Sequence, residues 1–306
     1  MPTPDAATLM RRAAMASMAV ALLLTLVKAA AYLFSNSVAM LASMADSGLD
    51  LLASAANYVA IRQALAPADR EHRFGHGKAE PLAGLAQSAF IVASALFLAV
   101  QSIDRFLIPQ VVENSAWALA VMGVSIVATL SLVLYQQRAI AASRSTAIRA
   151  DRAHYVGDLA GNLAVVAAIL LSSWFGWLWA DPLFALGVAA LLLSSAWHVG
   201  RDSLDQLMDR ELPDEERARI ARIIRGHPDV RDVHEIKTRM AGISTFIQAH
   251  VVLDGSLSLS AAHAITEGIE QALLHAYPGA QVIIHQDPAP PQHAEPTDAA
   301  PPIPAP

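Results

Sequence analysis

Two pairs of ionisable residues stand inside apolar stretches of the sequence at the same spacing. Asp46 and Asp50 are four residues apart, and so are His154 and Asp158. Four residues make about one helical turn, so each pair is predicted to point from one helix face, its members about 6 Å apart along the axis. An Asp at the centre of a membrane helix costs roughly 2.5–3.5 kcal/mol, so three uncompensated ones would cost on the order of 8–10 kcal/mol. A bound dication or protons must offset that cost.

If the two pairs face each other, they supply three carboxylates and one imidazole. This donor set suits tetrahedral Zn²⁺ and its neighbours better than Mg²⁺ or Ca²⁺, which favour shells of six or more oxygens. The alternative interpretation is that the four side chains only form hydrogen bonds between helices, or lie at a membrane interface. Two pairs at identical spacing favour the metal site.

A second group of candidate ligands lies in a short charged segment. Asp69, His72 and His76 fall within eight residues, and Gly75 and Gly77 would let the chain fold back on a metal ion. A solvated charged loop without a metal is the alternative.

A third group lies near the C-terminus and contains four histidines and one aspartate. Neighbouring strands lie 4.7–4.9 Å apart, close enough to bring histidines from two strands together. Chance surface histidines are the alternative. The group comprises His234, His250, His263, His285 and Asp287.

The composition indicates what must hold these residues in place. Of the 306 residues, 55% are hydrophobic and only 16% are charged, against roughly 25% charged in an ordinary soluble domain. The absence of cysteine excludes disulfides and thiolate metal sites. The net charge is -6 and the basic residues are scattered, so a nucleic-acid-binding function is excluded.

Most of the apolar residues come before residue 200, in stretches long enough to cross a bilayer. We therefore predict an α-helical membrane protein with six transmembrane helices in residues 1–205. Arg and Lys concentrate in the loops after the second and fourth spans, so both termini are expected to be cytoplasmic. The first span contains Lys28 and lacks a small-residue cleavage site, which favours a retained helix over a signal peptide. The predicted spans are 14–34, 39–63, 80–107, 115–137, 147–175 and 178–200.

Residues 206–288 have the composition of a soluble domain. Turn residues and periodicity predict a helix over 213–226, a hairpin of strands 230–240 and 244–253, a helix over 258–277 and a strand over 281–285. This order predicts an α+β domain with helices on one face of a small sheet. The proline-rich residues 289–306 are predicted to be disordered.

Four motifs in this order resemble those of the cation diffusion facilitators: Met44–Asp50, Phe74–Glu80, His154–Asp158 and Ile283–Pro288. The resemblance covers residues from about 10 to 290. It implies a homodimer in the cell's inner (plasma) membrane, with a ferredoxin-like cytoplasmic domain, that exchanges a divalent metal for protons. It also implies the roles of the ligands: Asp46, Asp50, His154 and Asp158 in the transport site; Asp69, His72 and His76 in a loop site; and His234, His250, His263, His285 and Asp287 in a cytoplasmic binuclear site.

The expected substrate is Zn²⁺, with Cd²⁺ and Fe²⁺ also accepted by three oxygens and one nitrogen. Zn²⁺ is also expected as a regulatory ligand of the cytoplasmic sites. Metal and protons compete for the same groups, and His154 is expected to carry the main coupling proton. Lys78 would repel a cation at the loop site unless neutralised, and Asp209 is its hypothesised partner.

Two other functions stay open at this point, and a third is not expected. A non-transporting metal sensor would keep the cytoplasmic histidines but would not need the buried pairs. A channel would conduct metal without proton coupling. An enzyme is not expected, because a membrane metallohydrolase needs an open ligand position beside an acid or base, and the sequence has no His-Glu-x-x-His.

Overall fold

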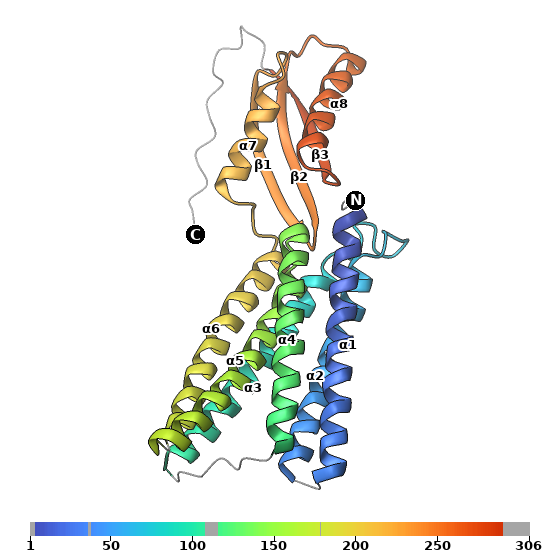
Figure 1. Ribbon diagram of the computed structural model, residues 1–306. Helices are drawn as coiled ribbons and strands as arrows, with labels where there is room; N and C mark the ends of the chain where they lie inside the picture. Colours follow the sequence, from blue (N-terminus) through green and yellow to red (C-terminus); the bar gives the residue numbers. More distant parts are fainter. Residues whose placement is uncertain (1–3, 36–37, 108–115, 178, 290–306) are drawn as a thin grey trace. The chain divides into compact units, whose positions relative to one another are not determined.

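The computed structural model describes residues 4–35, 38–107, 116–177 and 179–289 (Figure 1). The predicted disordered tail therefore lies, apart from Ala289, outside the described residues. The chain divides into two compact units. The first is helical and comprises residues up to Arg210 together with Ala241–Ile243; the second comprises Glu211–Met240 and the residues from Ser244 onward.

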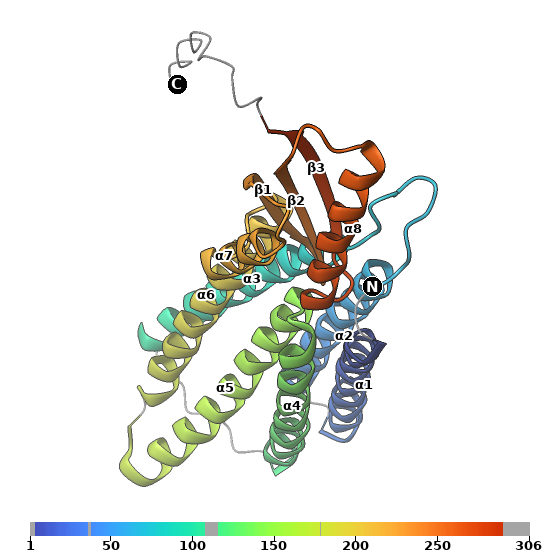
Figure 2. The same ribbon diagram turned by 90° about the horizontal axis from the view of Figure 1, so that it is seen from above.

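The helical unit contains six long helices that run alongside one another (Figures 1 and 2). Helix α1 packs against both α2 and α4, α3 pairs with α6, and α5 contacts both α4 and α6. Among the described residues, five helices are long and apolar enough to cross a membrane: α1, α3, α4, α5 and α6. The six are α1 (Pro4–Ser35), α2 (Val38–Ala64), α3 (Ala79–Leu107), α4 (Ala116–Ser143), α5 (Thr146–Phe175) and α6 (Ala180–Leu207).

Three helices extend further than the sequence predicts. Helix α1 begins at Pro4, ahead of the predicted start at 14, because helix-compatible polar residues precede its apolar run. Helix α4 continues to Ser143 instead of ending at 137, and α6 continues to Leu207, past the expected domain boundary at 205. The predicted ends followed the end of each apolar run. No Gly or Pro follows residue 137 in α4, and Gly200 does not end α6, so polar residues extend both helices beyond their apolar runs.

Local signals define helix α5, which carries His154 and Asp158. The Ser145 side chain caps its start by accepting a hydrogen bond from the Ile148 N–H at 3.1 Å. Gly176 ends it in the left-handed region at φ +66°. Gly157 lets α5 approach α6 closely, since a Cβ there would lie 2.2 Å from Leu192 Cδ2. Two of the candidate ligands therefore lie on a helix packed closely against its neighbour.

The C-terminal unit has the predicted order α-β-β-α-β. It comprises α7 (Asp214–Arg225), β1 (Asp232–Ala241), β2 (Ser244–Leu253), α8 (Leu259–Ala276) and β3 (Gln281–Pro288). The sheet order is β1-β2-β3, and β2 pairs with β3 in parallel. Strand β3 is longer than the predicted 281–285. It continues through the ligand candidate Asp287 and ends at Pro288.

Both helices of this unit cover the same face of the sheet. Ile220 of α7 and Leu273 of α8 are fully buried in one cluster with Ile247 and Val251 of β2. Residues of β2 alternate between faces. His250 therefore lies on the face of the sheet opposite the helices.

Strand β1 contains a bulge beside a candidate ligand. Glu235 has φ +47°, and Val233 and Thr238 are both buried although they are five residues apart. A regular strand would place these two residues on opposite faces, so one extra residue is inserted between them. The bulge directly follows His234 and affects how that side chain is presented.

Candidate metal centres

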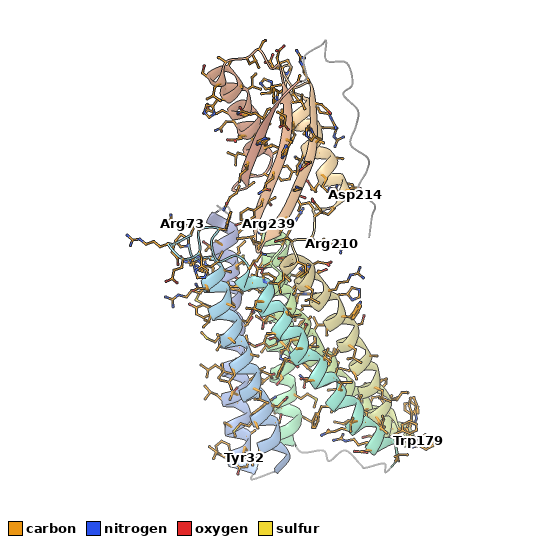
Figure 3. All side chains as sticks on the ribbon, turned by 180° about the vertical axis from the view of Figure 1, so that it is seen from behind. Tyr32, Arg73, Trp179, Arg210, Asp214 and Arg239 are labelled. Atoms are coloured by element: carbon orange, nitrogen blue, oxygen red, sulfur yellow. The ribbon has the colours of Figure 1, made fainter. Side chains whose placement is uncertain are left out.

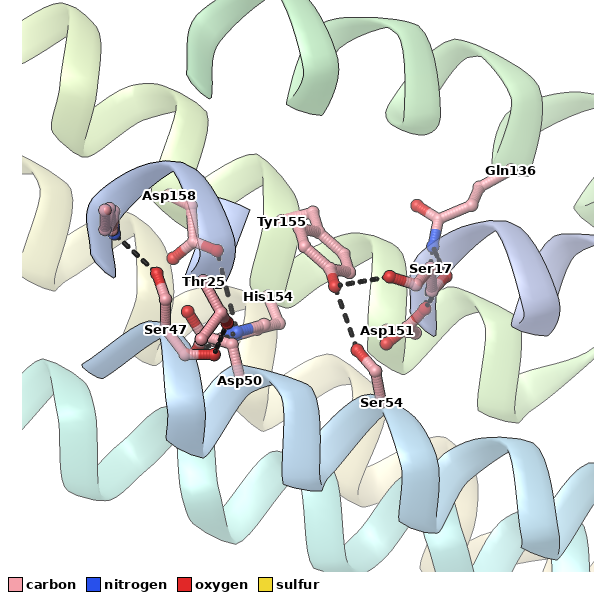
Figure 4. A network of polar contacts seen from close by, with 11 residues as sticks. Ser17, Thr25, Ser47, Asp50, Ser54, Gln136, Asp151, His154, Tyr155 and Asp158 are labelled. Carbon is pink, nitrogen blue, oxygen red and sulfur yellow. Dashed lines mark hydrogen bonds and ion pairs between the residues drawn. The ribbon is translucent and has the colours of Figure 1, made fainter. Parts of the chain in front are cut away.

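Three of the four residues predicted for the transport site come together between α2 and α5. His154 Nε2 lies 3.0 Å from Asp50 Oδ1 and 3.6 Å from Asp158 Oδ2 (Figure 4). Each residue offers one ligand atom, and these atoms lie within 4.8 Å of one another. The His154 side chain is only 8% exposed. One imidazole and two carboxylates at this spacing can bind one divalent cation.

Asp46, the fourth predicted ligand, does not join this group. It is more exposed than the other three and its oxygens lie outside the 4.8 Å cluster. It does line the same cavity, of about 730 Å³, as Asp50, His154 and Asp158. The structure therefore shows three clustered ligand atoms, with a further carboxylate on the cavity wall.

The cavity reaches the cluster from one end of the bundle. On α5 its lining begins at His154 and continues toward the C-terminal end, and on α3 it begins at Ile91 and continues to Gln101. On α2, which runs in the opposite direction, the lining residues are Asp50 and those before it. All of these lie toward the end of the bundle where α1 ends and α2 begins.

The other end of the bundle is closed by buried apolar side chains. Met10, Ile61, Ala139 and Ile148 are all 0% exposed and form one cluster from α1, α2, α4 and α5. This cluster lies between the carboxylates and the end of the bundle that carries Arg73. Figure 3 shows Arg73 at that end, with Tyr32 and Trp179 at the opposite end.

A buried polar network that the sequence analysis missed lies between the apolar cluster and the metal ligands. Ser17 Oγ and Gln136 Nε2 both donate to Asp151 Oδ2, the second at 2.8 Å, and all three residues are at most 1% exposed. Tyr155 donates to the Ser17 carbonyl oxygen at 3.2 Å, and its hydroxyl lies 2.9 Å from Ser54 Oγ (Figure 4). These bonds join α1, α2, α4 and α5.

The sequence contains a signal for this network. Asp151 precedes His154 by three residues and Tyr155 by four, so the helix repeat places all three near one another. Ser17 and Gln136 carried no such signal, because isolated Ser and Gln residues in apolar helices follow no diagnostic pattern.

The predicted loop site is assembled between α2 and α3. Asp69 Oδ2 lies 3.3 Å from His76 Nε2, and Asp69 Oδ1 lies 3.5 Å from His72 Nδ1. The backbone N–H groups of His72 and Glu71 donate to Asp69 Oδ1, and the His72 bond is the main reason that the pKa of this carboxyl is lowered. Gly75 turns the loop at φ +83°. The three side chains therefore offer ligand atoms to one cation.

Lys78 forms the ion pair considered from the sequence. Its Nζ lies 3.0 Å from Asp209 Oδ1 and donates to the Leu207 carbonyl oxygen at 3.4 Å. The pair connects the start of α3 to the end of α6. Lys78 follows His76 by two residues, and the pair neutralises its ammonium with the Asp209 carboxylate.

The C-terminal cluster lies on the sheet face opposite α7 and α8. Asp287 Oδ2 lies 2.9 Å from His250 Nδ1 and 3.4 Å from His234 Nε2, and these three residues offer grouped ligand atoms. His285 Nε2 lies 3.3 Å from Asp287 Oδ1, and its ring centroid lies 4.6 Å from that of His250. One carboxylate therefore contacts histidines from all three strands.

His263 is not part of this group in the described structure. It is exposed on α8, and α8 covers the other sheet face. Glu235, which the sequence analysis did not select, lies beside the cluster, its Oε2 3.9 Å from His250 Nε2. A hydrogen bond from Lys237 is the main cause of the lowered pKa of Glu235. It therefore adds a carboxylate at the edge of the cluster.

Comparison with known proteins identifies the family. The family model for the cation efflux transmembrane domain matches residues 14–208, and the one for the cation efflux protein cytoplasmic domain matches residues 212–289. A helical membrane unit with buried carboxylates, followed by a small histidine-bearing domain, is thus the architecture of a cation transporter. The chain belongs to the cation efflux family and is an integral membrane protein.

The curated relatives match over nearly their whole length. A protein named cation-efflux pump FieF from Shewanella oneidensis is 49% identical over 285 residues, which is 93% of this chain and 95% of the relative. The FieF proteins of Serratia proteamaculans and Klebsiella pneumoniae are each 44% identical. Those alignments cover 93% and 92% of this chain, and 95% and 93% of the respective relatives.

Proposed function

We propose that this protein exports divalent metal cations in exchange for protons, with Zn²⁺ as the preferred substrate and Cd²⁺ and Fe²⁺ also accepted. The observation that carries the proposal is the group of Asp50, His154 and Asp158 at the closed end of a one-sided cavity within the helical bundle. Ionisable residues at such a depth are costly unless they serve an ion pathway.

The donor set supports the choice of metal. Borderline cations such as Zn²⁺ accept imidazole nitrogen together with carboxylate oxygen, whereas Mg²⁺ and Ca²⁺ favour oxygen shells. Asp46 lies on the same cavity wall and is proposed to complete a tetrahedral shell when metal binds. This step requires only that α2 or the Asp46 side chain moves toward the cluster.

The same ligands provide a reason for proton coupling. Metal binding requires a neutral imidazole and ionised carboxylates, so protons displace metal and metal displaces protons. His154 is proposed to carry the main coupling proton, assisted by the aspartates it contacts. An inward proton gradient would then drive release of metal on the outer side.

The one-sided cavity supports alternating access. We propose that the structure is the outward-facing state, and that breaking the Asp151–Tyr155 network opens the other side. In this proposal α2 is the sixth membrane span, since its 27 residues are long enough and its polar residues Asp46, Ser47 and Asp50 line the cavity. Both termini are then cytoplasmic, because Arg and Lys concentrate in the two loops on the closed side.

The remaining assignments concern the assembly and the two outer clusters. We propose a homodimer of six-span protomers in the inner (plasma) membrane, each with a ferredoxin-like cytoplasmic domain. The clusters around Asp69 and around Asp287 are proposed to bind Zn²⁺ as a regulatory ligand. A pure metal sensor would not need a cluster at the end of a membrane cavity, so transport is favoured.

Zinc binding by purified protein tests the site. Asp50→Ala is expected to lower by one the number of Zn²⁺ ions bound per chain in isothermal titration calorimetry. Asp104→Ala is the matched control, because Asp104 is an exposed carboxylate near the end of α3 that does not line the cavity. An unchanged number of bound Zn²⁺ ions in Asp50→Ala, or equal losses in both variants, would contradict the assignment.

A further inference from the structure

A lysine inside the membrane unit lines the same cavity as the candidate ligands. Lys28 on α1 donates from Nζ to Ser47 Oγ on α2 at 2.6 Å. Thr25, about one turn earlier, donates to the Ser47 carbonyl oxygen at 2.9 Å. Two bonds therefore connect α1 to the turn of α2 that carries Asp46 and Asp50, and one of them fixes an ammonium there.

Lys28 is a cation among carboxylates. The ionisable residues that line the cavity within the described structure are Asp46, Asp50, His154, Asp158 and Lys28. Helices α3, α4 and α6 contribute only neutral side chains, such as Gln101, Thr129 and Leu192. With a neutral imidazole and three carboxylates, Lys28 leaves the cavity with two negative charges.

Two negative charges match one divalent cation. A cavity loaded with a dication is then formally neutral, which is the least costly state for a site surrounded by apolar helices. Without the ammonium, the loaded cavity would keep one uncompensated negative charge. It would attract the cation more strongly at the moment when the cation must leave.

We propose that Lys28 is a fixed counter-charge of the transport site that weakens metal binding enough to permit release. An ammonium has three donors and no acceptor, so Lys28 cannot be a metal ligand. It acts through the field at the carboxylates, and Ser47 holds it in position. This inference rests on the proposed function, since it takes Asp50, His154 and Asp158 as the binding site.

Three substitutions separate charge from packing. Lys28→Met removes the charge and keeps the length of the side chain, whereas Lys28→Gln also keeps a donor for Ser47. Lys28→Arg keeps the charge. The readouts are the Zn²⁺ dissociation constant of the site that Asp50→Ala removes, measured in the purified full-length protein, and the KM and kcat of Zn²⁺ transport in proteoliposomes.

Loss of the charge is expected to tighten Zn²⁺ binding by at least about tenfold, because a unit charge near a dication is worth more than 1.4 kcal/mol at an effective dielectric of about 20. KM and kcat should fall together in Lys28→Met and Lys28→Gln, while Lys28→Arg stays close to the parent. Unchanged affinity in both neutral variants would overturn the proposal. So would an arginine variant as altered as the neutral ones, because that result indicates packing.

The Asp50→Ala variant distinguishes failure of this inference from failure of the proposed function. If Asp50→Ala binds and transports Zn²⁺ normally, the site assignment is wrong, whatever the lysine variants do. If Asp50→Ala loses binding and the neutral lysine variants leave affinity unchanged, only the counter-charge proposal fails.

Discussion

Removing the Tyr155 hydroxyl should open the closed end of the membrane unit more often. The hydroxyl donates to the Ser17 carbonyl oxygen at 3.2 Å and lies 2.9 Å from Ser54 Oγ. Tyr155→Phe deletes both bonds and leaves the ring in its apolar cluster with Leu132 and Val133. Since these bonds join α5 to α1 and α2, they stabilise the closed arrangement.

The size of the effect follows from the number of bonds lost. Hydrogen bonds between membrane helices contribute about 0.6 kcal/mol on average and about 1.7 kcal/mol at most. Two bonds therefore contribute about 1–3 kcal/mol, and since 1.4 kcal/mol is a factor of ten, the open population should rise at least about fivefold.

The absence of native cysteine makes this shift measurable. Ala139→Cys places a single small thiol at a position that is 0% exposed within the apolar cluster of the closed end. The rate at which a maleimide modifies this thiol should follow the open population. We expect the rate to rise about fivefold or more when Tyr155→Phe is added, since the hydrogen-bond loss predicts that shift.

A matched control keeps the test specific. Ser131→Ala also deletes a hydroxyl on a membrane helix, but that hydroxyl donates within its own helix, to the Val127 carbonyl oxygen at 2.8 Å. It should leave the modification rate unchanged. Equal rates in the parent and in Tyr155→Phe, with both folded, would refute the view that this network holds the closed end together.

Three further predictions concern other parts of the chain. Gly157→Ala should lower the melting temperature and the transport rate, because overpacking a close helix contact costs about 1–3 kcal/mol. Gly161→Ala is the control and should have little effect, since no atom lies within 4 Å of its new Cβ. Equal melting curves for the two variants would contradict this prediction. Reversing the charge of Lys78 or Asp209 alone should impair transport, and exchanging the two residues should restore part of it; transport assays showing no rescue would argue against a role for the pair. Chelation should lower the melting temperature of zinc-loaded protein, as measured by calorimetry. His250→Ala should reduce the difference in melting temperature between zinc-loaded and chelated protein. A difference as large as in the parent protein would show that the stabilising metal binds elsewhere.

The long elements were predictable from local patterns. Helix α3 was expected over 80–107 and is found at Ala79–Leu107, because apolar length alone defines a span of this kind. Helix α4 was cut short at 137, since apolar length does not show where polar residues continue a helix. In the C-terminal unit, turn residues and periodicity predicted the order of helices and strands, and the structure has that order.

The candidate sites were predictable only to the level of one helix or one strand. The repeat of four residues placed His154 and Asp158 on one face of α5, and Asp50 faces them. The rotation of α2 that leaves Asp46 outside the group depends on packing between helices. The same limit applies to His263, because its helical period does not indicate which sheet face α8 covers, and to the bond between Ser17 and Asp151, which are 134 residues apart.

Zn²⁺ flux into proteoliposomes, measured with and without an imposed pH gradient, tests the central claim most directly. The parent protein is expected to show flux that depends on the gradient, Asp50→Ala to show none, and His154→Ala to lose the dependence on the gradient. Zn²⁺ flux through the parent protein that does not depend on the pH gradient would indicate a channel. Sustained, gradient-dependent flux in Asp50→Ala would contradict the account, because metal and protons would then be exchanged at another site.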